Sequence, residues 1–236
     1  MAKDAMTNPI DLRLGRWQDV LADVETCDAV ICDPPYSART HEGHNGMEEQ
    51  IRALTGQLTR EPISYEQFSP AAVSEFVSFW APRCRGWIGA MTSHDLIPAW
   101  EAAYKLAKLH PFAPVPIIQK RPRLVGDGPS SWAVYFMVAR PRNREFATWG
   151  CLPGAYDAPT VKGSGIAGAK PINLMRAIVR DYSRPGDLVV DPFCGSGTTA
   201  LACAQEGRRC ITSEEKPEHF AIAQRRLARG YTPGLF

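Results

Sequence analysis

The sequence predicts an α/β protein built on a doubly wound, mostly parallel sheet, and three observations predict it. Strand-like and helix-like segments alternate along most of the chain, which is the pattern of βαβ units. Two apolar strands end directly at an acid, Asp33 and Asp191, and the second runs into a glycine loop that opens a helix. Two consecutive strands in the middle of the chain predict an antiparallel edge strand.

The first half of the chain alternates regularly between the two kinds of segment. Apolar runs mark the strands, and periodic apolar positions, with a proline in the first turn of two helices, mark the helices. In order, we expect a strand at 10–15, a short helix at 17–24, a buried strand at 28–32, a helix at 71–80, a strand at 86–92 and a helix at 97–109.

The second half begins with the two consecutive strands and then returns to alternation. Residues 115–119 and 131–139 are these strands, and Pro171 opens a helix that extends to residue 183. The last segment, from residue 187 onward, reads as strand, glycine loop, helix, strand and helix. We expect a single domain over residues 1–236, interrupted by a polar insertion at 37–63.

Composition excludes several classes of protein. With 236 residues, of which 44% are hydrophobic and 22% charged, the chain can bury one sizeable core. No apolar run approaches the ~20 residues of a membrane helix, so we expect a soluble, cytoplasmic protein without a membrane partner. The seven cysteines form no zinc-binding spacing, and the two histidines of HEGH at 41–44 stand too close for a metal motif, so we expect no metal.

A basic stretch with interleaved aromatic residues follows the first of the two central strands. Such a stretch suits a nucleic-acid backbone, although a solvated strand edge explains it as well. Its candidate DNA-binding residues are Lys120, Arg121, Arg123, Arg140, Arg142 and Arg144.

The loop at 191–199, DPFCGSGTT, has the features of a cofactor cradle. Gly195 and Gly197 permit a sharp turn and close backbone approach, and the following helix offers unpaired N–H groups. The spacing to Glu214, at the end of the next strand, fits either a dinucleotide or S-adenosylmethionine, because in both the acid binds ribose hydroxyls. The acid at the strand end, Asp191, favours S-adenosylmethionine, whose methionine part it can meet.

The motif DPPY at 33–36 suggests a site for an aromatic amine. Asp33 ends a parallel strand, and Pro34 and Pro35 remove two N–H groups while holding their carbonyl acceptors rigidly. Tyr36 adds a flat face on which a base can stack. An amine of adenine or cytosine that donates to Asp33 and a proline carbonyl would become a better nucleophile. Methylation at cytosine carbon 5 would need a cysteine, typically after a proline, and no Pro-Cys pair occurs.

Together these motifs make the chain resemble the DNA amino-methyltransferases, specifically the permuted β-type group of restriction-modification and phage enzymes. The resemblance rests on LRLG at 12–15, DPPY, Lys170-Pro171, DPFCGSGTT and Glu214 in this order. The chain departs from the family at Arg16, where the family commonly has Asp, and at Thr212, where the family usually has Gly.

The resemblance implies a seven-stranded sheet, S-adenosylmethionine as cofactor and DNA as partner. It implies catalytic roles for the four residues of DPPY, and adenine N6 as target, because DPPY in this family usually accompanies adenine. The cofactor residues that it implies are Asp33, Lys170, Asp191, Pro192, Phe193, Gly195, Gly197, Thr198 and Glu214.

It also implies a short target-recognition segment at 142–169, and it leaves open a homodimer and a cognate restriction nuclease. The alternatives are an N4-cytosine DNA methyltransferase, an RNA or protein-amide methyltransferase, and a catalytically silent DNA-binding homologue.

Overall fold

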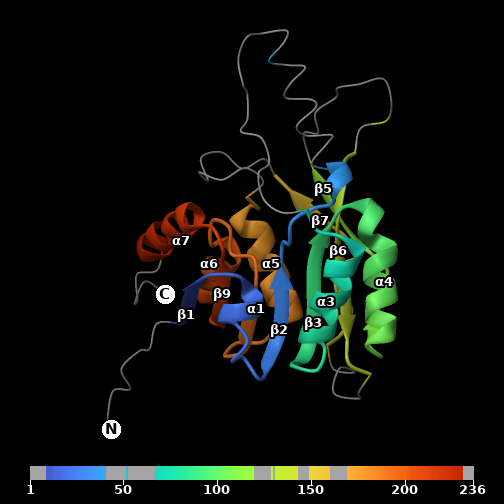
Figure 1. Ribbon diagram of the computed structural model, residues 1–236, viewed down its shortest axis with the longest axis horizontal. Helices are drawn as coiled ribbons and strands as arrows, with labels where there is room; N and C mark the ends of the chain where they lie inside the picture. The colour runs from blue at the N-terminus through green and yellow to red at the C-terminus, as the bar shows by residue number, and fades with distance from the viewer. Residues whose placement is uncertain are drawn as a thin grey trace.

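The computed structural model contains one continuous sheet of nine strands with helices on both faces (Figure 1). It describes residues 9–40, 52, 67–119, 129, 131–142, 149–159 and 169–230. The strands, in chain order, are β1 Ile10–Leu14, β2 Cys27–Cys32, β3 Cys84–Thr92, β4 His110–Pro111, β5 Val115–Gln119, β6 Ala133–Arg140, β7 Tyr156–Ala158, β8 Leu188–Asp191 and β9 Arg209–Glu214.

The helices agree closely with the predicted segments. They are α1 Trp17–Val20, α3 Pro70–Trp80, the 3₁₀ helix η1 His94–Leu96, α4 Ile97–Leu106, α5 Ile172–Tyr182, α6 Thr198–Gln205 and α7 Pro217–Gly230. Helix α3 begins after Ser69, whose hydroxyl accepts the N–H of Ala72 at 3.2 Å, and Pro70 occupies its first position.

The strand order β1-β9-β8-β2-β3-β6-β5-β7 brings the two ends of the chain together in the sheet. The C-terminal unit β8-α6-β9 inserts between β1 and β2, and all of these strands run parallel. Strand β8 pairs with β2 through Val189 beside Ala29 and Val190 beside Val30. The loops that follow β2 and β8 therefore leave the same edge of the sheet as neighbours.

Two hydrophobic cores lie on opposite faces of the sheet, because successive strand residues point to opposite sides. On β2, Ala29 and Ile31 pack into the core that α5 and α6 cover. Val30 and Cys32 pack into the core that α1, α3 and α4 cover. This arrangement confirms the predicted doubly wound α/β fold.

The sheet differs from the prediction in strand number and in the place of the antiparallel strand. Nine strands replace the expected seven, because β4 and β7 have only two and three residues and show no periodicity. Strand β6 runs against both of its neighbours, β3 and β5, and so lies inside the sheet. Strand β7, from the expected target-recognition segment, pairs parallel with β5 and forms the edge.

Among the described residues, no helix is both long and apolar enough to cross a membrane. The expected insertion at 37–63 lies outside the described residues except for 37–40 and 52, and the segment 142–169 is described only at 142, 149–159 and 169.

Candidate active site

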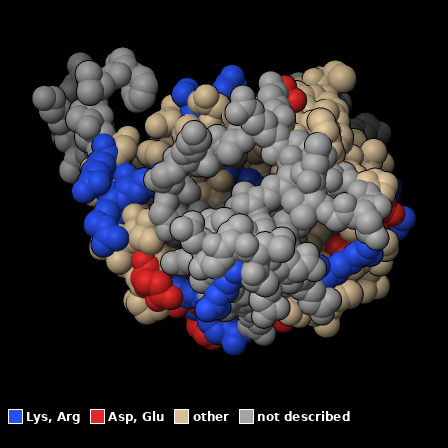
Figure 2. All heavy atoms as spheres, turned by 90° about the horizontal axis from the view of Figure 1, so that it is seen from above, with Lys and Arg blue, Asp and Glu red and all other residues tan. Residues whose placement is uncertain are grey.

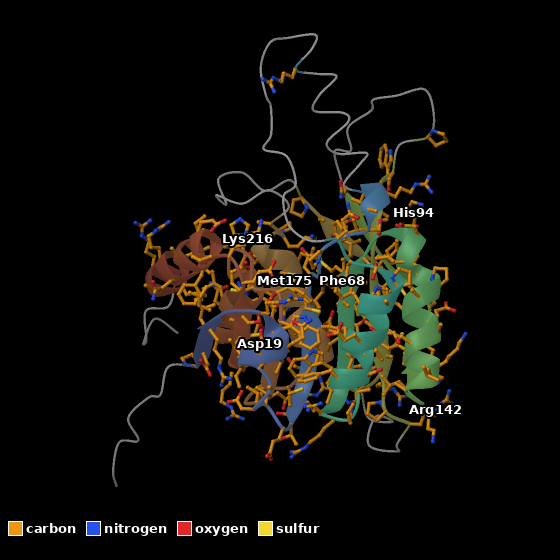
Figure 3. The ribbon with its side chains drawn as sticks, viewed as in Figure 1. Asp19, Phe68, His94, Arg142, Met175 and Lys216 are labelled. Carbon is orange, nitrogen blue, oxygen red and sulfur yellow. The ribbon has the colours of Figure 1, made fainter. Side chains whose placement is uncertain are left out.

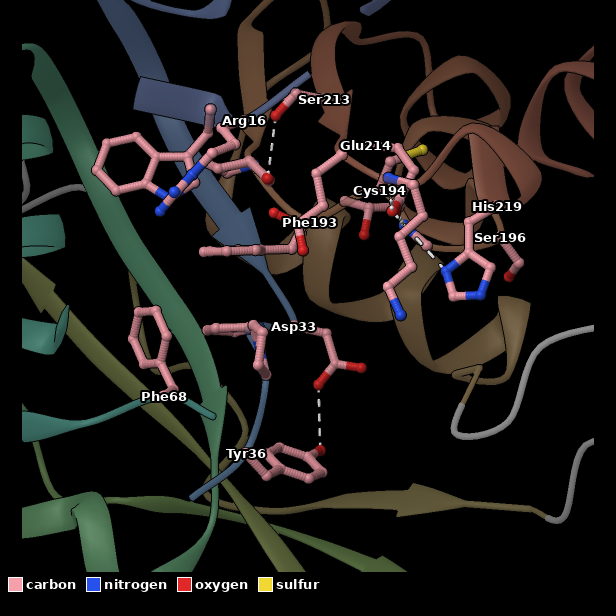
Figure 4. A pocket seen from close by; sticks show the side chains of 18 of the residues that line it. Arg16, Asp33, Tyr36, Phe68, Phe193, Cys194, Ser196, Ser213, Glu214 and His219 are labelled. Atoms are coloured by element: carbon pink, nitrogen blue, oxygen red, sulfur yellow. Dashed lines mark hydrogen bonds and ion pairs between the residues drawn. The ribbon is translucent and has the colours of Figure 1, made fainter. Parts of the chain in front are cut away.

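The pairing of β2 with β8 places two predicted motifs side by side at the carboxyl edge of the sheet. Asp33 follows β2 directly, and the glycine loop follows β8. Open α/β sheets bind ligands at this edge, outside the ends of neighbouring strands. Figure 4 shows the two motifs on the walls of one pocket, with Asp33 and Tyr36 at one end and Glu214 and His219 at the other.

The pocket has a volume of about 280 Å³ and receives side chains from six parts of the chain. Its lining comes from the β1–α1 junction, the DPPY motif, the start of α3, the residues around Lys170, the glycine loop and the end of β9 with the start of α7. Figure 2 views this edge of the sheet from above, with Lys and Arg in blue and Asp and Glu in red.

At one end of the pocket, two side chains hold the carboxylate of Asp33. The Tyr36 hydroxyl donates to its Oδ1 at 3.1 Å, and the Lys170 ammonium donates to its Oδ2. The same ammonium lies 5.2 Å from the centre of the Tyr36 ring. Pro34 and Pro35 also line the pocket, so all four residues of DPPY lie on its wall.

The charge of this cluster is balanced. Burial disfavours the Lys170 ammonium, but the attraction of Asp33, together with that of Tyr36 and the hydrogen bonds to both, outweighs burial and raises the pKa of the lysine above its ordinary value. Burial, together with the negative charge of Asp33, raises the pKa of the Tyr36 hydroxyl. The structure thus brings Lys170, predicted at the cofactor, into contact with Asp33 of the DPPY motif.

The glycine loop is fastened to the end of β9 by hydrogen bonds. The Cys194 N–H donates to the Ser213 carbonyl at 2.8 Å, and the Ser213 hydroxyl donates to the Pro192 carbonyl at 3.0 Å. The Thr212 hydroxyl, at the position where the family usually has Gly, donates to the Asp191 carbonyl at 2.7 Å. The departure at Thr212 thus adds a bond that fixes the loop.

Glu214 lines the pocket with both carboxylate oxygens already oriented. Its Oε2 accepts the N–H of Gly195 at 2.8 Å and its Oε1 accepts the N–H of Lys216 at 3.0 Å. His219 Nδ1 lies 3.8 Å from Oε1. Burial raises the pKa of the carboxyl, while the two backbone N–H groups oppose that shift. Each oxygen keeps a lone pair that can accept a ligand hydroxyl.

Asp191 lies behind the wall of the pocket, and its side chain is 1% exposed. Its Oδ1 accepts the N–H of Phe193 at 3.1 Å, the bond of a local Asx turn. Burial raises the pKa of this carboxyl to about 7. The predicted contact of Asp191 with the cofactor stays a prediction, and the described geometry shows a residue that shapes the loop from within.

The two glycines of the loop have different surroundings. Gly195 lines the pocket at φ +53°, and a Cβ there would meet open space. Gly197 has φ +79°, and a Cβ there would lie 3.3 Å from Leu227 of α7. The backbone at Gly195 is therefore open to the pocket, whereas Gly197 lets the loop turn beneath α7. Pro192, Phe193 and Thr198, predicted at the cofactor, line the same pocket.

Two aromatic residues that the motifs did not predict, Phe68 and Trp17, line the pocket together with Phe193. The ring of Phe193 meets that of Phe68 edge to face at 5.7 Å, and Trp17 lines the same pocket. Phe68 is joined to the DPPY motif by a hydrogen bond from its N–H to the Tyr36 carbonyl at 3.1 Å. No sequence motif marks Phe68, because it follows a long polar segment.

Arg226 of α7 was also missed. Its Nη1 donates to the Ser196 carbonyl at 3.0 Å, the Ser196 hydroxyl at 2.8 Å and the Thr198 hydroxyl at 2.7 Å. One guanidinium group thus spans the bend of the glycine loop. No motif in the sequence singles out the arginine pair at 225–226.

The predicted basic residues do not gather at the pocket in the part of the chain that the structure describes. Because β6 runs opposite to β3, its last residue, Arg140, lies at the amino edge of the parallel strands, away from Asp33. Figure 3 shows Arg142 at that far edge, opposite Lys216. The four remaining candidates, Lys120, Arg121, Arg123 and Arg144, lie outside the described residues.

Comparison with known proteins adds a family match and relatives. A family model described as DNA methylase matches residues 149–225, which include Lys170, the glycine loop and Glu214. The type II methyltransferase M.Cfr9I of Citrobacter freundii is 44% identical over 57 residues. That match covers 24% of this chain and 19% of the relative, so the chain aligns with about a fifth of the relative's length.

Two solved structures share the fold of this chain over most of its length, although their sequences are only 20% and 15% identical to it. The M1.HpyAVI complex with SAM has a TM-score of 0.64 and 20% identity, and the match covers 92% of this chain and 99% of that one. PvuII DNA methyltransferase, titled cytosine-N4-specific, also has a TM-score of 0.64, with 15% identity and coverage of 98% and 89%.

The chain shares its α/β fold with M1.HpyAVI and with PvuII DNA methyltransferase. The match of residues 149–225 to the DNA methylase model and the similarity to a type II methyltransferase confirm the resemblance predicted from the motifs.

Proposed function

We propose that the protein transfers a methyl group from S-adenosylmethionine to the exocyclic amine of a base in DNA, with adenine N6 as the target. One observation carries the proposal: a single pocket joins the DPPY motif, with its Asp33 carboxylate, to the glycine loop with Glu214. A methyl donor and an amine acceptor must occupy such adjoining sites for direct transfer.

The Glu214 end of the pocket fits S-adenosylmethionine. The open space over Gly195 admits a ligand close to the backbone, and the free lone pairs of Glu214 suit two ribose hydroxyls. The half-buried ring of Phe193, beside Phe68, offers an apolar wall for a purine. When bound, the cofactor supplies an electrophilic methyl group at its sulfonium centre.

The Asp33 end fits an amine on a flat ring. Asp33 accepts an N–H of the amine, which favours the pyramidal form whose lone pair can attack the methyl carbon. The ring of Tyr36 provides a stacking surface worth about 1–3 kcal/mol. Extruding the base from a duplex costs a few kcal/mol, so phosphate contacts must supply the difference. Arg121 and Arg123 remain the sequence-based candidates for those contacts.

We choose adenine because the motif begins with Asp33, and DPPY usually accompanies adenine in the family that the chain resembles. N4-cytosine is the second candidate, because PvuII DNA methyltransferase, whose title gives cytosine N4, shares the fold over 98% of this chain. We extend the proposal to a single catalytic domain, with target recognition shared between residues 37–63 and 142–169. We also include in the proposal that the protein forms a homodimer and that a cognate restriction nuclease acts on the same DNA site.

Methyl transfer to DNA of mixed sequence, with labelled S-adenosylmethionine, tests the proposal. Mass spectrometry of the hydrolysed DNA should reveal labelled N6-methyldeoxyadenosine, and Asp33→Ala should lower its formation at least about 100-fold. Labelled N4-methylcytosine would correct the target base. Label that appears only in RNA or protein, or no label at all, would refute the assignment to DNA.

A further inference from the structure

His219 lines the pocket at the end where Glu214 lies, and no sequence motif predicted it there. It is the third residue of α7, and its side chain is 25% exposed. Its Nδ1 faces Glu214 Oε1 across 3.8 Å, and Figure 4 marks this approach with a dashed line. An imidazole and a carboxylate therefore stand together on the same part of the pocket wall.

Both side chains are held in place by the backbone around them. The Lys216 N–H donates to Glu214 Oε1 at 3.0 Å, and the Gly195 N–H donates to Oε2 at 2.8 Å. The Phe220 N–H donates to the Lys216 carbonyl at 2.9 Å and closes the helical turn that carries His219. Backbone bonds thus hold the carboxylate on one side of the gap, and the first turn of α7 holds the imidazole on the other.

The gap has a size that one hydroxyl oxygen can bridge. A direct N–H···O bond joins atoms about 2.7–3.2 Å apart, so the separation of 3.8 Å is too long for one. An oxygen about 2.8 Å from both atoms would accept the imidazole N–H and donate its own hydrogen to the carboxylate. The negative charge of Glu214 favours the hydrogen on Nδ1, the nitrogen that faces it. An ether or carbonyl oxygen has no hydrogen for Glu214, so the gap selects a hydroxyl.

We propose that His219 binds a ribose hydroxyl of S-adenosylmethionine together with Glu214, an inference that rests on the proposed function. One hydroxyl of the vicinal pair lies between His219 Nδ1 and Glu214 Oε1, and its neighbour donates to Oε2. The carboxylate only accepts hydrogen bonds, so the imidazole supplies the donor that a hydroxyl also needs. His219 is therefore a specificity residue for the sugar of the cofactor.

Calorimetry with S-adenosylhomocysteine and its 2′-deoxy and 3′-deoxy analogues tests the bridge. His219→Leu removes the donor and keeps an apolar side chain of moderate size, whereas His219→Asn keeps an N–H near the place of Nδ1. A double-mutant cycle between His219→Leu and one of the two analogues should show a coupling of about fivefold, the size of a neutral hydrogen bond. His219→Asn should restore most of this coupling. A coupling below about twofold with both analogues would overturn the proposal.

The cycle separates ribose recognition from a structural role of His219 in α7. Damage to the helix would lower the affinity for all three ligands equally and cancel in the cycle. His94→Leu is the matched control, because His94 is exposed on η1 and lies away from Lys216 in Figure 3. It should bind all three ligands as the wild type does.

The same titrations distinguish failure of this inference from failure of the proposed function. If the wild type binds no S-adenosylhomocysteine, the proposed function fails, and this inference fails with it. If the wild type binds S-adenosylhomocysteine but neither hydroxyl is coupled to His219, only the present inference fails.

Discussion

Tyr36 contributes its hydroxyl as well as its ring to the target end of the pocket. The hydroxyl donates to Asp33 at 3.1 Å, so it orients the carboxylate that we propose as the acceptor of the amine. Tyr36→Phe keeps the stacking face but removes this bond. We expect the single-turnover rate to fall about tenfold, the lower part of the range for a bond to a charged group, because Lys170 still holds Asp33. A rate equal to that of the wild type would show that the ring alone matters.

Asp191 is a buried carboxyl whose ionisation opposes folding. Its pKa is about 7 in the folded chain, against about 3.9 when unfolded. Between these values the folded chain holds a proton that the unfolded chain releases. Stability from this group is therefore present at low pH and lost as the pH rises toward 7.

Asp191→Asn removes this ionisation and keeps an oxygen that can accept the Phe193 N–H. The melting temperature of the variant relative to the wild type should therefore rise from pH 5 to pH 7 and then level off. Thermal unfolding of both proteins at four pH values measures it. A difference that stays constant with pH would contradict the burial of an ionisable carboxyl at this position.

At the scale of elements, helix α7 stabilises the glycine loop through Arg226. Removal of this guanidinium leaves three oxygens of Ser196 and Thr198 without their donor. We expect Arg226→Ala to weaken S-adenosylhomocysteine binding about tenfold and to lower the melting temperature, since each lost partner in a buried site costs about 1–3 kcal/mol. Calorimetry measures the affinity.

Arg225→Ala is the control for that measurement, because Arg225 is the neighbouring residue of α7 and is exposed. It should bind S-adenosylhomocysteine as the wild type does. Equal losses in the two variants would attribute the effect to general charge rather than to the loop contact.

Local patterns predicted most elements, because apolar runs and helical periodicity are local properties. The strand ends at Asp33 and Asp191 were predicted correctly for this reason. The three residues of β7 were missed because they are too few to show a period. The reach of Arg226 was missed because a helix face in the sequence does not tell which loop packs on it.

At the scale of the whole molecule, the site depends on a pairing between distant parts of the chain. The Asp28 carboxylate accepts the Leu188 N–H at 2.8 Å and joins β2 to β8 across 160 positions. No local pattern contains that adjacency, and only the resemblance to a family implied that the two motifs share a site. The antiparallel pairing of β6 with β3 likewise places Arg140 at the far edge of the sheet, although Arg140 is close to the other basic residues in the sequence.

The central claim is that one pocket has a cofactor end at Glu214 and a target end at Asp33. It predicts that damage at either end stops methyl transfer, while only damage at the Glu214 end weakens cofactor binding. Glu218→Ala, on the first turn of α7 and exposed, serves as the control for both measurements.

Calorimetric titration of Asp33→Ala and Glu214→Ala with S-adenosylhomocysteine, beside their methyl-transfer rates on DNA, tests this claim most directly. Asp33→Ala should bind S-adenosylhomocysteine as the wild type does and yet transfer no measurable methyl group, whereas Glu214→Ala should lose affinity at least about tenfold, the cost of a lost bond to a charged group. Equal loss of affinity in both variants, or full affinity in Glu214→Ala, would contradict a pocket divided in this way.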